Sequence, residues 1–263
     1  MFNRSLFCSH LARMVALSRS LKGYLTDQEV QFLAMAASVL PPSLGEVLEI
    51  GCSRGKSTTI LAKSVQIAGG KRIVAVDPFT LPAKLDDFYS NLETNGVRDV
   101  VELHRTKSQD LVPAWSRPIR LLWIDGNHTY EGALADFDGF GRHCTPGSIV
   151  AFHDVLHGFE GPIRVFCERV LLSGAYGPCG VCGSIGWSQR VSSADISRRY
   201  ASQKFSLFRK LNHLIPHVVL GRSPRGAIRT IWKVRRSLVP HGELKPELWV
   251  AEVERNLASS NGG

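Results

Sequence analysis

The sequence predicts an α/β protein built on a doubly wound, mostly parallel sheet, with a basic and mostly helical addition at its C-terminal end. Short apolar segments that suit buried strands alternate with amphipathic segments that suit helices through most of residues 41–190. With 263 residues, 44% of them hydrophobic, the chain can form one such domain but not two large ones. No apolar run approaches the roughly 18 residues that a membrane span needs.

The first strong helix signal begins near Thr26 and stops before Pro41-Pro42. The segment Thr26-Asp-Gln-Glu29 fits a capping box, in which each of its two end side chains accepts a hydrogen bond from the other's backbone N–H. Val30 and Leu33 then fall on one helical face. Residues 1–26 carry several arginines and no acid, and we expect a short basic helix there.

Strands and helices then alternate along the chain. The strand segments are short apolar runs, and the helical segments are longer, amphipathic and mostly closed by glycine, asparagine or proline turns. The predicted strands cover residues 46–50, 72–76, 100–104, 120–124 and 148–152. The predicted helices cover residues 57–67, 86–94, 130–143 and 162–172. Such alternation predicts a parallel sheet with helices on both faces.

The pattern weakens after residue 160. Residues 180–189 are expected to form a strand at the sheet edge, and residues 193–238 one or two basic helices. Residues 248–253 fit a strand and a helix equally well.

Positive charge is concentrated in one part of the chain. The formal net charge is +9, yet residues 190–236 alone hold twelve Lys and Arg against one acid, Asp195, a net +11. Apolar residues recur among these bases at helical spacing, for example Ile228 and Ile231. This segment can contact an anionic membrane surface or a second subunit, or it can form a solvated helical face.

A glycine-rich turn follows the first predicted strand, in the segment Glu49-Ile-Gly51-Cys-Ser-Arg-Gly55-Lys-Ser57-Thr58. A nucleotide-binding P-loop needs four residues between its first glycine and Gly-Lys-Ser/Thr, and here three intervene. A dinucleotide fingerprint needs Gly-x-Gly-x-x-Gly, which the segment also lacks. The remaining interpretations are an ordinary strand–turn–helix corner and a loop for a ligand without phosphates.

The Glu-x-Gly-x-x-x-Gly spacing resembles motif I of the class I methyltransferases that use S-adenosylmethionine (SAM), which have a Rossmann-like fold. The resemblance implies that the Glu49 carboxylate faces the SAM ammonium, directly or through water. Small residues would let the methionine part lie against the backbone. The cofactor contacts expected from this loop are Gly51, Ser53, Gly55, Ser57 and Thr58.

Two later strand ends extend this prediction. The second strand ends at Asp77, where an acid can accept hydrogen bonds from both ribose hydroxyls; a turn or cap aspartate is the alternative. The third leads to Ser108, near the position where relatives contact adenine; a simple helix cap is the alternative.

The fourth and fifth predicted strands each end in an aspartate, Asp125 and Asp154. A right-handed crossover would place the two strands side by side, or nearly so, with both carboxylates on one crevice. Burying two acids together is costly unless a cation lies between them, and oxygen ligands favour Mg²⁺. Two unrelated turn aspartates are the alternative.

The segment Asp125-Gly-Asn-His128-Thr-Tyr130 and the pair His153-Asp154 resemble a narrower branch, the macrolide-sugar O-methyltransferases and cephalosporin hydroxylase-like proteins (methyltransferase family 24-like). The resemblance covers about residues 45–190. It implies that Asp125 and Asp154 bind a metal, with His153 a third ligand, and that Asp125 also lies at the cofactor. It implies that His128 is the general base that deprotonates the acceptor hydroxyl.

The combined interpretation is a SAM-dependent, Mg²⁺-assisted O-methyltransferase acting on a hydroxyl of a sugar, glycolipid or polyketide-like small molecule. We divide the chain into an N-terminal helical segment (1–40), a SAM-binding methyltransferase domain (41–190) and a basic C-terminal region (191–263). The alternatives are an RNA-directed methyltransferase, for which no RNA-binding module is visible, and a non-catalytic SAM-fold protein held at a membrane.

We expect a homo-oligomer with no nucleic-acid partner. No export signal is recognisable, so we expect a cytoplasmic protein with free cysteines, membrane-associated if the basic segment 190–236 binds lipid.

Overall fold

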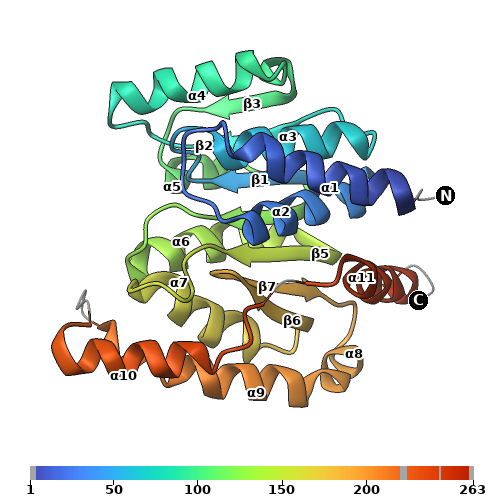
Figure 1. Cartoon of the computed structure of the whole chain (residues 1–263). Coiled ribbons are helices and arrows are strands. Elements are labelled where there is room, and N and C mark those ends of the chain that lie inside the picture. Colours follow the sequence, from blue (N-terminus) through green and yellow to red (C-terminus); the bar gives the residue numbers. More distant parts are fainter. Residues whose placement is uncertain (1–3, 220–223, 243, 261–263) are drawn as a thin grey trace.

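The computed structural model describes residues 4–219, 224–242 and 244–260, and its centre is a seven-stranded sheet (Figure 1). The strand order is β3-β2-β1-β4-β5-β7-β6. Strands β1 to β5 pair in parallel, whereas β7 and β6 run antiparallel to their neighbours. The strands are β1 Glu46–Ile50, β2 Ile73–Val76, β3 Val101–His104, β4 Ile119–Ile124, β5 Cys144–Phe152, β6 Tyr176–Cys182 and β7 Ile185–Arg190.

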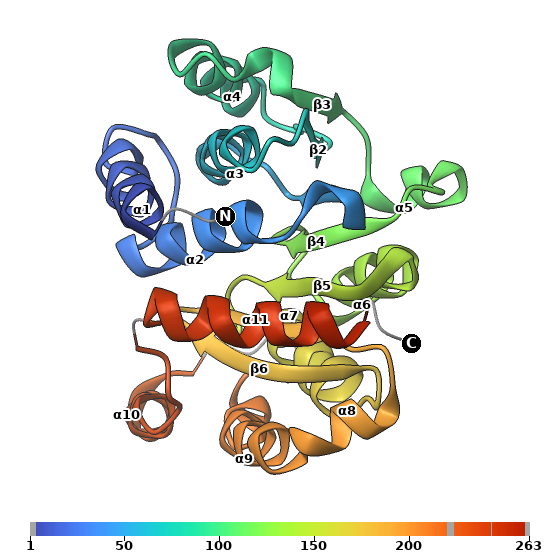
Figure 2. The same cartoon turned by 90° about the vertical axis from the view of Figure 1, so that its right-hand side faces the viewer.

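Helices cover both faces of this sheet (Figure 2). They are α1 Arg4–Ser18, α2 Asp27–Val39, α3 Lys56–Ile67, α4 Pro82–Thr94, α5 Ser108–Leu111, α6 Tyr130–Phe140, α7 Glu160–Val165, α8 Ala194–Arg199, α9 Ala201–Asn212, α10 Gly226–Ser237 and α11 Pro246–Ser260. A π-helical turn, Phe166–Leu171, continues α7. This three-layer arrangement confirms the predicted fold class.

The sheet separates two apolar cores because alternate residues of a strand point to opposite faces. In β1, Val47 packs with α1–α4 and α11, whereas Leu48 and Ile50 pack with α6, α7, α9 and α10. Both cores are essentially closed to solvent, with Val47 and Leu48 at 0% exposure. The N-terminal helices and the C-terminal α11 therefore belong to the same packed body as the sheet.

Two predicted elements differ from the structure in the C-terminal third. The single strand expected over residues 180–189 is a hairpin, β6–β7, and β7 rather than β6 pairs with β5. The hairpin turns at Gly183, whose φ of +60° lies in the left-handed region that glycine adopts without strain. The described parts of the basic stretch 193–238 contain three α-helices, α8, α9 and α10, and the undecided segment 248–253 is helical within α11.

The strand order reverses between β1 and β4. From β1 the chain continues to β2 and β3 on one side of the sheet, and β4 and β5 lie on the other side of β1. A crevice forms at the carboxyl ends of the strands where the order reverses. The adjacency of β4 and β5, expected from the right-handed crossover, is present. Within the described residues no helix is both long and apolar enough to cross a membrane.

Candidate active site

A cavity of about 1230 Å³ opens at the carboxyl ends of β1, β2, β4 and β5. The glycine-rich loop after β1 and the loop after β4 both contribute to this cavity. Helix α2 and the first turns of α3 and α5 also line it. The predicted site residues that line it are Gly51, Ser53, Ser57, Asp77, Ser108, Asp125, His128, His153 and Asp154. The fold thus brings nine of the twelve predicted site residues to one cleft.

The glycine loop is held against β4 and β2. Gly51 has φ +89°, and a Cβ there would lie 2.1 Å from the carbonyl oxygen of Asp125, so only glycine allows this approach. The backbone N–H of Ser53 donates to Asp77 Oδ2 at 2.9 Å. Asp77 also accepts from the N–H of Phe79 at 2.7 Å, which fixes its carboxylate at the cleft wall.

Glu49 does not line the cleft. Its side chain is fully buried beneath the loop, where it accepts hydrogen bonds from the hydroxyls of Ser57 and Thr58. Burial raises its pKa to about 8, against the lowering effect of those hydroxyls. Direct contact with a ligand ammonium is therefore available to Ser57, which lines the cleft, whereas Glu49 supports it from behind.

Two other predicted loop residues also lie outside the cleft wall. Thr58 is buried with Glu49. Gly55 takes φ +81° at the N-cap of α3, where a Cβ would come within 2.9 Å of the Phe88 ring. Both residues shape the loop, but the structure gives them no surface in the cavity.

Ser108 reaches the cleft at the start of α5 and donates its hydroxyl hydrogen bond to Asp136 of α6. Asp136 is buried, and burial raises its pKa to about 6, partly offset by the Ser108 hydrogen bond. Sequence reasoning missed Asp136. The available signal was an acid on the inward face of α6, between the buried residues Ala133 and Phe140.

The two predicted aspartates converge beside a histidine. Nε2 of His128 lies 3.4 Å from Asp125 Oδ1 and 3.4 Å from Asp154 Oδ2. One ligand atom from each of these three residues falls within 4.8 Å of the others. The His128 ring stacks on Phe159 with ring centroids 4.5 Å apart, which holds the imidazole over the carboxylates. Such a group of oxygen and nitrogen atoms has the size and chemistry of a divalent-cation site.

His153 has a different environment from the one expected of a metal ligand. Its Nδ1 lies 3.1 Å from Asp125 Oδ1, and its Nε2 lies 3.7 Å from Glu29 Oε1. Burial alone would lower its pKa, but Asp125, Glu29 and Asp154 raise it to about 11. The atoms of Asp125 and Asp154 that could share one ion with a histidine lie grouped with His128, so the geometry favours His128 over His153 as the nitrogen ligand.

Glu29 was recognised in the sequence only as a helix cap. The capping box is present, with the Thr26 N–H donating to Glu29 Oε2 at 2.8 Å. The other oxygen, Oε1, accepts from the N–H and hydroxyl of Ser184 in the β6–β7 turn. Burial would raise the pKa of Glu29, but hydrogen bonds from His153, Ser184 and Thr26 hold it well below its usual range. Glu29 thus connects α2 with the β6–β7 hairpin and with His153 of the site.

His157 is a further cleft residue that the sequence did not reveal. It follows the β5 tip, and its Nδ1 makes a short hydrogen bond with Asp154. Asp154 itself has φ +62°, a left-handed conformation that aspartate tolerates better than most residues. The β5 tip is therefore a tight turn that presents Asp154 between His128 and His157.

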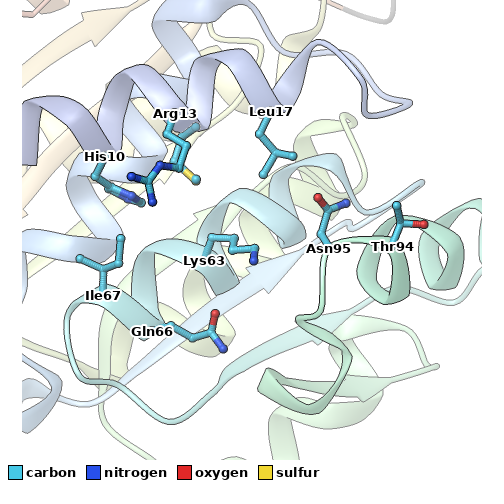
Figure 3. A pocket seen from close by; sticks show the side chains of 9 residues that line it. His10, Arg13, Leu17, Lys63, Gln66, Ile67, Thr94 and Asn95 are labelled. Carbon is cyan, nitrogen blue, oxygen red and sulfur yellow. The ribbon is translucent and has the colours of Figure 1, made fainter.

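A second cavity, of about 530 Å³, lies between α1, α3 and the end of α4 (Figure 3). His10, Arg13 and Leu17 point from α1 toward Lys63 and Gln66 of α3 (Figure 3). No carboxylate is among the described residues that line it. It is separate from the cleft at the strand ends and lacks the acids that the predicted chemistry needs.

Comparison with known families decides the identity of the domain. Residues 48–155, which carry the glycine loop and both aspartates, match a family model described as a methyltransferase domain, of methyltransferase family 24. Residues 48–155 are a SAM-dependent methyltransferase domain. The methyltransferase prediction is thereby confirmed, and the matched range contributes many of the residues that line the cleft at the strand ends.

Solved structures agree with this methyltransferase in fold. The O-methyltransferase TomG from Streptomyces achromogenes, in complex with SAM, is 19% identical, with a TM-score of 0.52 over 69% of this chain and 89% of its own. An O-methyltransferase from Bacillus cereus, in complex with SAH, is 19% identical, with a TM-score of 0.51 over 72% and 93%. The O-methyltransferase NovP is 13% identical, with a TM-score of 0.53 over 71% and 97%. At these identities the likeness establishes the fold alone.

The methyltransferase loop differs from a phosphate-binding loop in charge as well as in spacing. In a P-loop the backbone N–H groups surround a phosphate. Here the N–H of Ser53 is already bonded to Asp77, whose carboxylate would repel a phosphate placed beside it. The P-loop interpretation rejected on residue counting is disfavoured again by this arrangement.

Proposed function

We propose that this methyltransferase transfers the SAM methyl group to a hydroxyl oxygen of a sugar, glycolipid or polyketide-like small molecule, assisted by a divalent cation, Mg²⁺. The observation that carries the proposal is the convergence of Asp125 and Asp154 on the cleft that also holds the glycine loop and Asp77. TomG, named as an O-methyltransferase involved in tomaymycin synthesis, supports a small-molecule acceptor. The comparisons favour neither an RNA-directed enzyme nor a non-catalytic scaffold.

The donor set fits a divalent cation. Three carboxyl groups, those of Glu29, Asp125 and Asp154, surround one imidazole, His153. Even when that imidazole is protonated, acidic charge exceeds basic charge around it, and oxygen atoms of Asp125 and Asp154 remain directed at His128. A hard cation bound by these oxygens would offset the excess.

The chain's own residues then divide the work. When bound, SAM supplies an electrophilic methyl group, and the cation makes a coordinated hydroxyl more acidic. Asp77 and Ser108, which line the cleft, would hold the ribose and adenine ends of the cofactor, and Ser57 the methionine end. His128 would accept the hydroxyl proton as the acceptor oxygen attacks the methyl carbon and S-adenosylhomocysteine leaves. His153 orients Asp125 through the hydrogen bond to its Oδ1.

His128 is placed for two roles, general base and third metal ligand. Replacing it with alanine separates them when Mg²⁺ affinity and turnover are both measured. If His128 is a ligand, Mg²⁺ affinity falls; if it is the base, Mg²⁺ affinity is kept while turnover falls and its acid limb in the pH profile disappears. The base role is the one we propose.

The test of the function begins with calorimetry of SAM binding to the full chain. A screen of glycosylated and polyketide-like acceptors then follows, with Mg²⁺ and with a chelator. We expect methylated product that depends on Mg²⁺. Turnover that survives the chelator would remove the metal from the proposal, and SAM binding without any methylated hydroxyl would remove the acceptor class. Size-exclusion chromatography of the same samples tests the predicted homo-oligomer.

A further inference from the structure

Helix α10 exposes a continuous row of apolar side chains. Ile231, Val234 and Leu238 follow one another at helical spacing along one face, and they are 47%, 59% and 65% exposed. Ile228, on the edge of the same row, is 52% exposed. A row of this kind normally packs against something, and within residues 4–219, 224–242 and 244–260 nothing buries it.

The neighbouring side of α10 is docked on the protein and holds the row in its outward orientation. Trp232 and, just beyond the helix, Val239 are buried in the core formed with α9. Arg235 donates to the carbonyl oxygen of His213 at 3.2 Å and contacts the ring of His217 at 2.9 Å. Because the helix is docked by these contacts, the apolar row cannot turn inward without breaking them.

The charge of α10 selects what can cover the row. The helix and its N-cap contain Arg225, Arg229, Lys233, Arg235 and Arg236, and the helix contains no acid. A second copy packed on the same face would bring two strongly basic helices together without a counter-charge. RNA would satisfy the bases but offers nothing to the aliphatic row. An anionic bilayer satisfies both, since acyl chains cover the apolar side chains and lipid phosphates meet the bases.

We propose that α10 is an interfacial helix that binds this methyltransferase to an anionic membrane surface. The inference is independent of the metal and of the acceptor. It concerns residues 226–238, which take no part in the cleft.

The position of α10 gives the binding a consequence for the site. Just before the helix, Pro224 approaches Gly158, 3.7 Å from where a Cβ on that glycine would lie. Gly158 follows His157, which lines the cleft. In Figure 1 the parallel strands point to the left, and α10 lies at the lower left, on the same side as their carboxyl ends. Resting on the proposed function, this placement favours an amphiphilic acceptor, such as the glycolipid class, over a freely soluble one.

The experiment is sedimentation of the full chain with vesicles of phosphatidylcholine, with and without phosphatidylglycerol, at low and high salt. We expect binding to the anionic vesicles only, weakened by salt. The variant I231S/V234S/L238S should lose about tenfold or more in vesicle affinity, since it removes three of the side chains that would enter the interface. The matched control L248S alters an exposed leucine, 67% exposed, on the acidic start of α11 and should bind like the wild type.

The outcomes are distinct. Failure of the wild type to bind anionic vesicles, equal binding by the triple variant, or equal loss in L248S would each overturn the proposal. A dimer that the triple variant dissociates, or RNA binding without vesicle binding, would assign the row to another partner and likewise overturn it. Thermal unfolding and SAM calorimetry on the triple variant show that the fold and the cofactor site are intact, so a failed methyltransferase assay is not confused with failed membrane binding.

Hydrogen exchange with and without anionic vesicles tests the orientation. We expect new protection in α10 and in residues 154–159 and none in α4. Protection in α4 without any in α10 would contradict the proposal even if the protein sediments with vesicles.

Discussion

The carboxyl edge of the sheet and helix α10 each contain several charges of one sign, but these charges are buried at the sheet edge and exposed on α10. At the sheet edge, Glu29, Asp125 and Asp154 are largely buried and each is hydrogen-bonded to a histidine or a backbone N–H. On α10 the bases stand mostly in solvent beside exposed aliphatic side chains. A buried charge is costly unless a partner within the fold compensates it, whereas an exposed charge is solvated and remains available to bind another molecule. In the two proposals above, the buried charges organise the chemistry and the exposed charges bind a membrane surface.

The largest expected effect comes from removing a carboxylate at the sheet edge. Asp154→Ala should lower turnover by about 10²–10⁴-fold, because the proposed cation would lose a ligand and His128 loses a partner. Calorimetry with Mg²⁺ should show weakened binding, and Asp125→Ala should behave alike. Asp138→Ala, an exposed aspartate of α6 paired with Arg169, is the control and should keep full activity. Unchanged turnover in Asp154→Ala would contradict the proposal, since Asp154 would then contribute no more to turnover than the exposed Asp138.

The second effect is on stability, and it depends on pH. The pKa of Glu49 is raised by burial from its usual 4.5 to about 8, so between these values the folded protein keeps a proton that the unfolded chain releases. Stability therefore falls as pH rises through this window, by at most about 1.4 kcal/mol per pH unit from this group. Glu49→Gln cannot titrate and should flatten the fall.

The measurement is urea unfolding of the wild type and Glu49→Gln at both ends of that window. The comparison between the two proteins is needed because the raised pKa values of Asp136 and His153 act in the same direction. Parallel pH profiles would mean that Glu49 is ionised in the folded state, and that its two hydroxyl partners suffice to keep the charge buried.

A third, smaller effect tests the residue that sequence reasoning missed in the cleft. Asp136→Ala removes the acceptor of the Ser108 hydrogen bond, and we expect SAM affinity to fall about tenfold. Asp110→Ala, on the same α5 but exposed, should leave the affinity unchanged. Calorimetry with SAM measures both, and equal affinity in the wild type and Asp136→Ala would show that Asp136 only packs α5 against α6.

The parts of the site that the sequence predicted are those that topology imposes. A parallel α/β sheet brings strand ends to one edge, so Gly51, Asp77, Asp125 and Asp154 could be placed together from their position after apolar runs. The parts that it missed depend on packing between distant segments. Glu29 reaches the site only because α2 lies beside the β6–β7 turn, and that hairpin was itself predicted as one strand.

Local sequence also could not assign the histidines. The motif resemblance made His153 a ligand, but its role depends on Glu29, 124 positions earlier, whose carboxylate faces the imidazole. Likewise, the environment of Glu49 depends on the hydroxyls of Ser57 and Thr58 in α3, which donate hydrogen bonds to its buried carboxylate. Spacing in the sequence indicates which residues share an edge, whereas hydrogen-bond partners and burial decide what each of them can do.

The smallest expected effect is a change in the free energy of unfolding, and it tests whether the apolar row of α10 supports the fold. If the apolar row is free for an outside partner, I231S/V234S/L238S removes almost nothing from the packed core, and unfolding free energy should change by no more than about 0.5 kcal/mol per site. Trp232→Ala, on the neighbouring docked side of the helix, is the contrasting variant, and it should cost about 3 kcal/mol of local packing because this side chain is buried. Denaturant unfolding and hydrogen exchange of α10 measure both. A large loss in the triple variant would mean that the row already supports the fold, and the outward-facing interpretation of α10 would have to be abandoned.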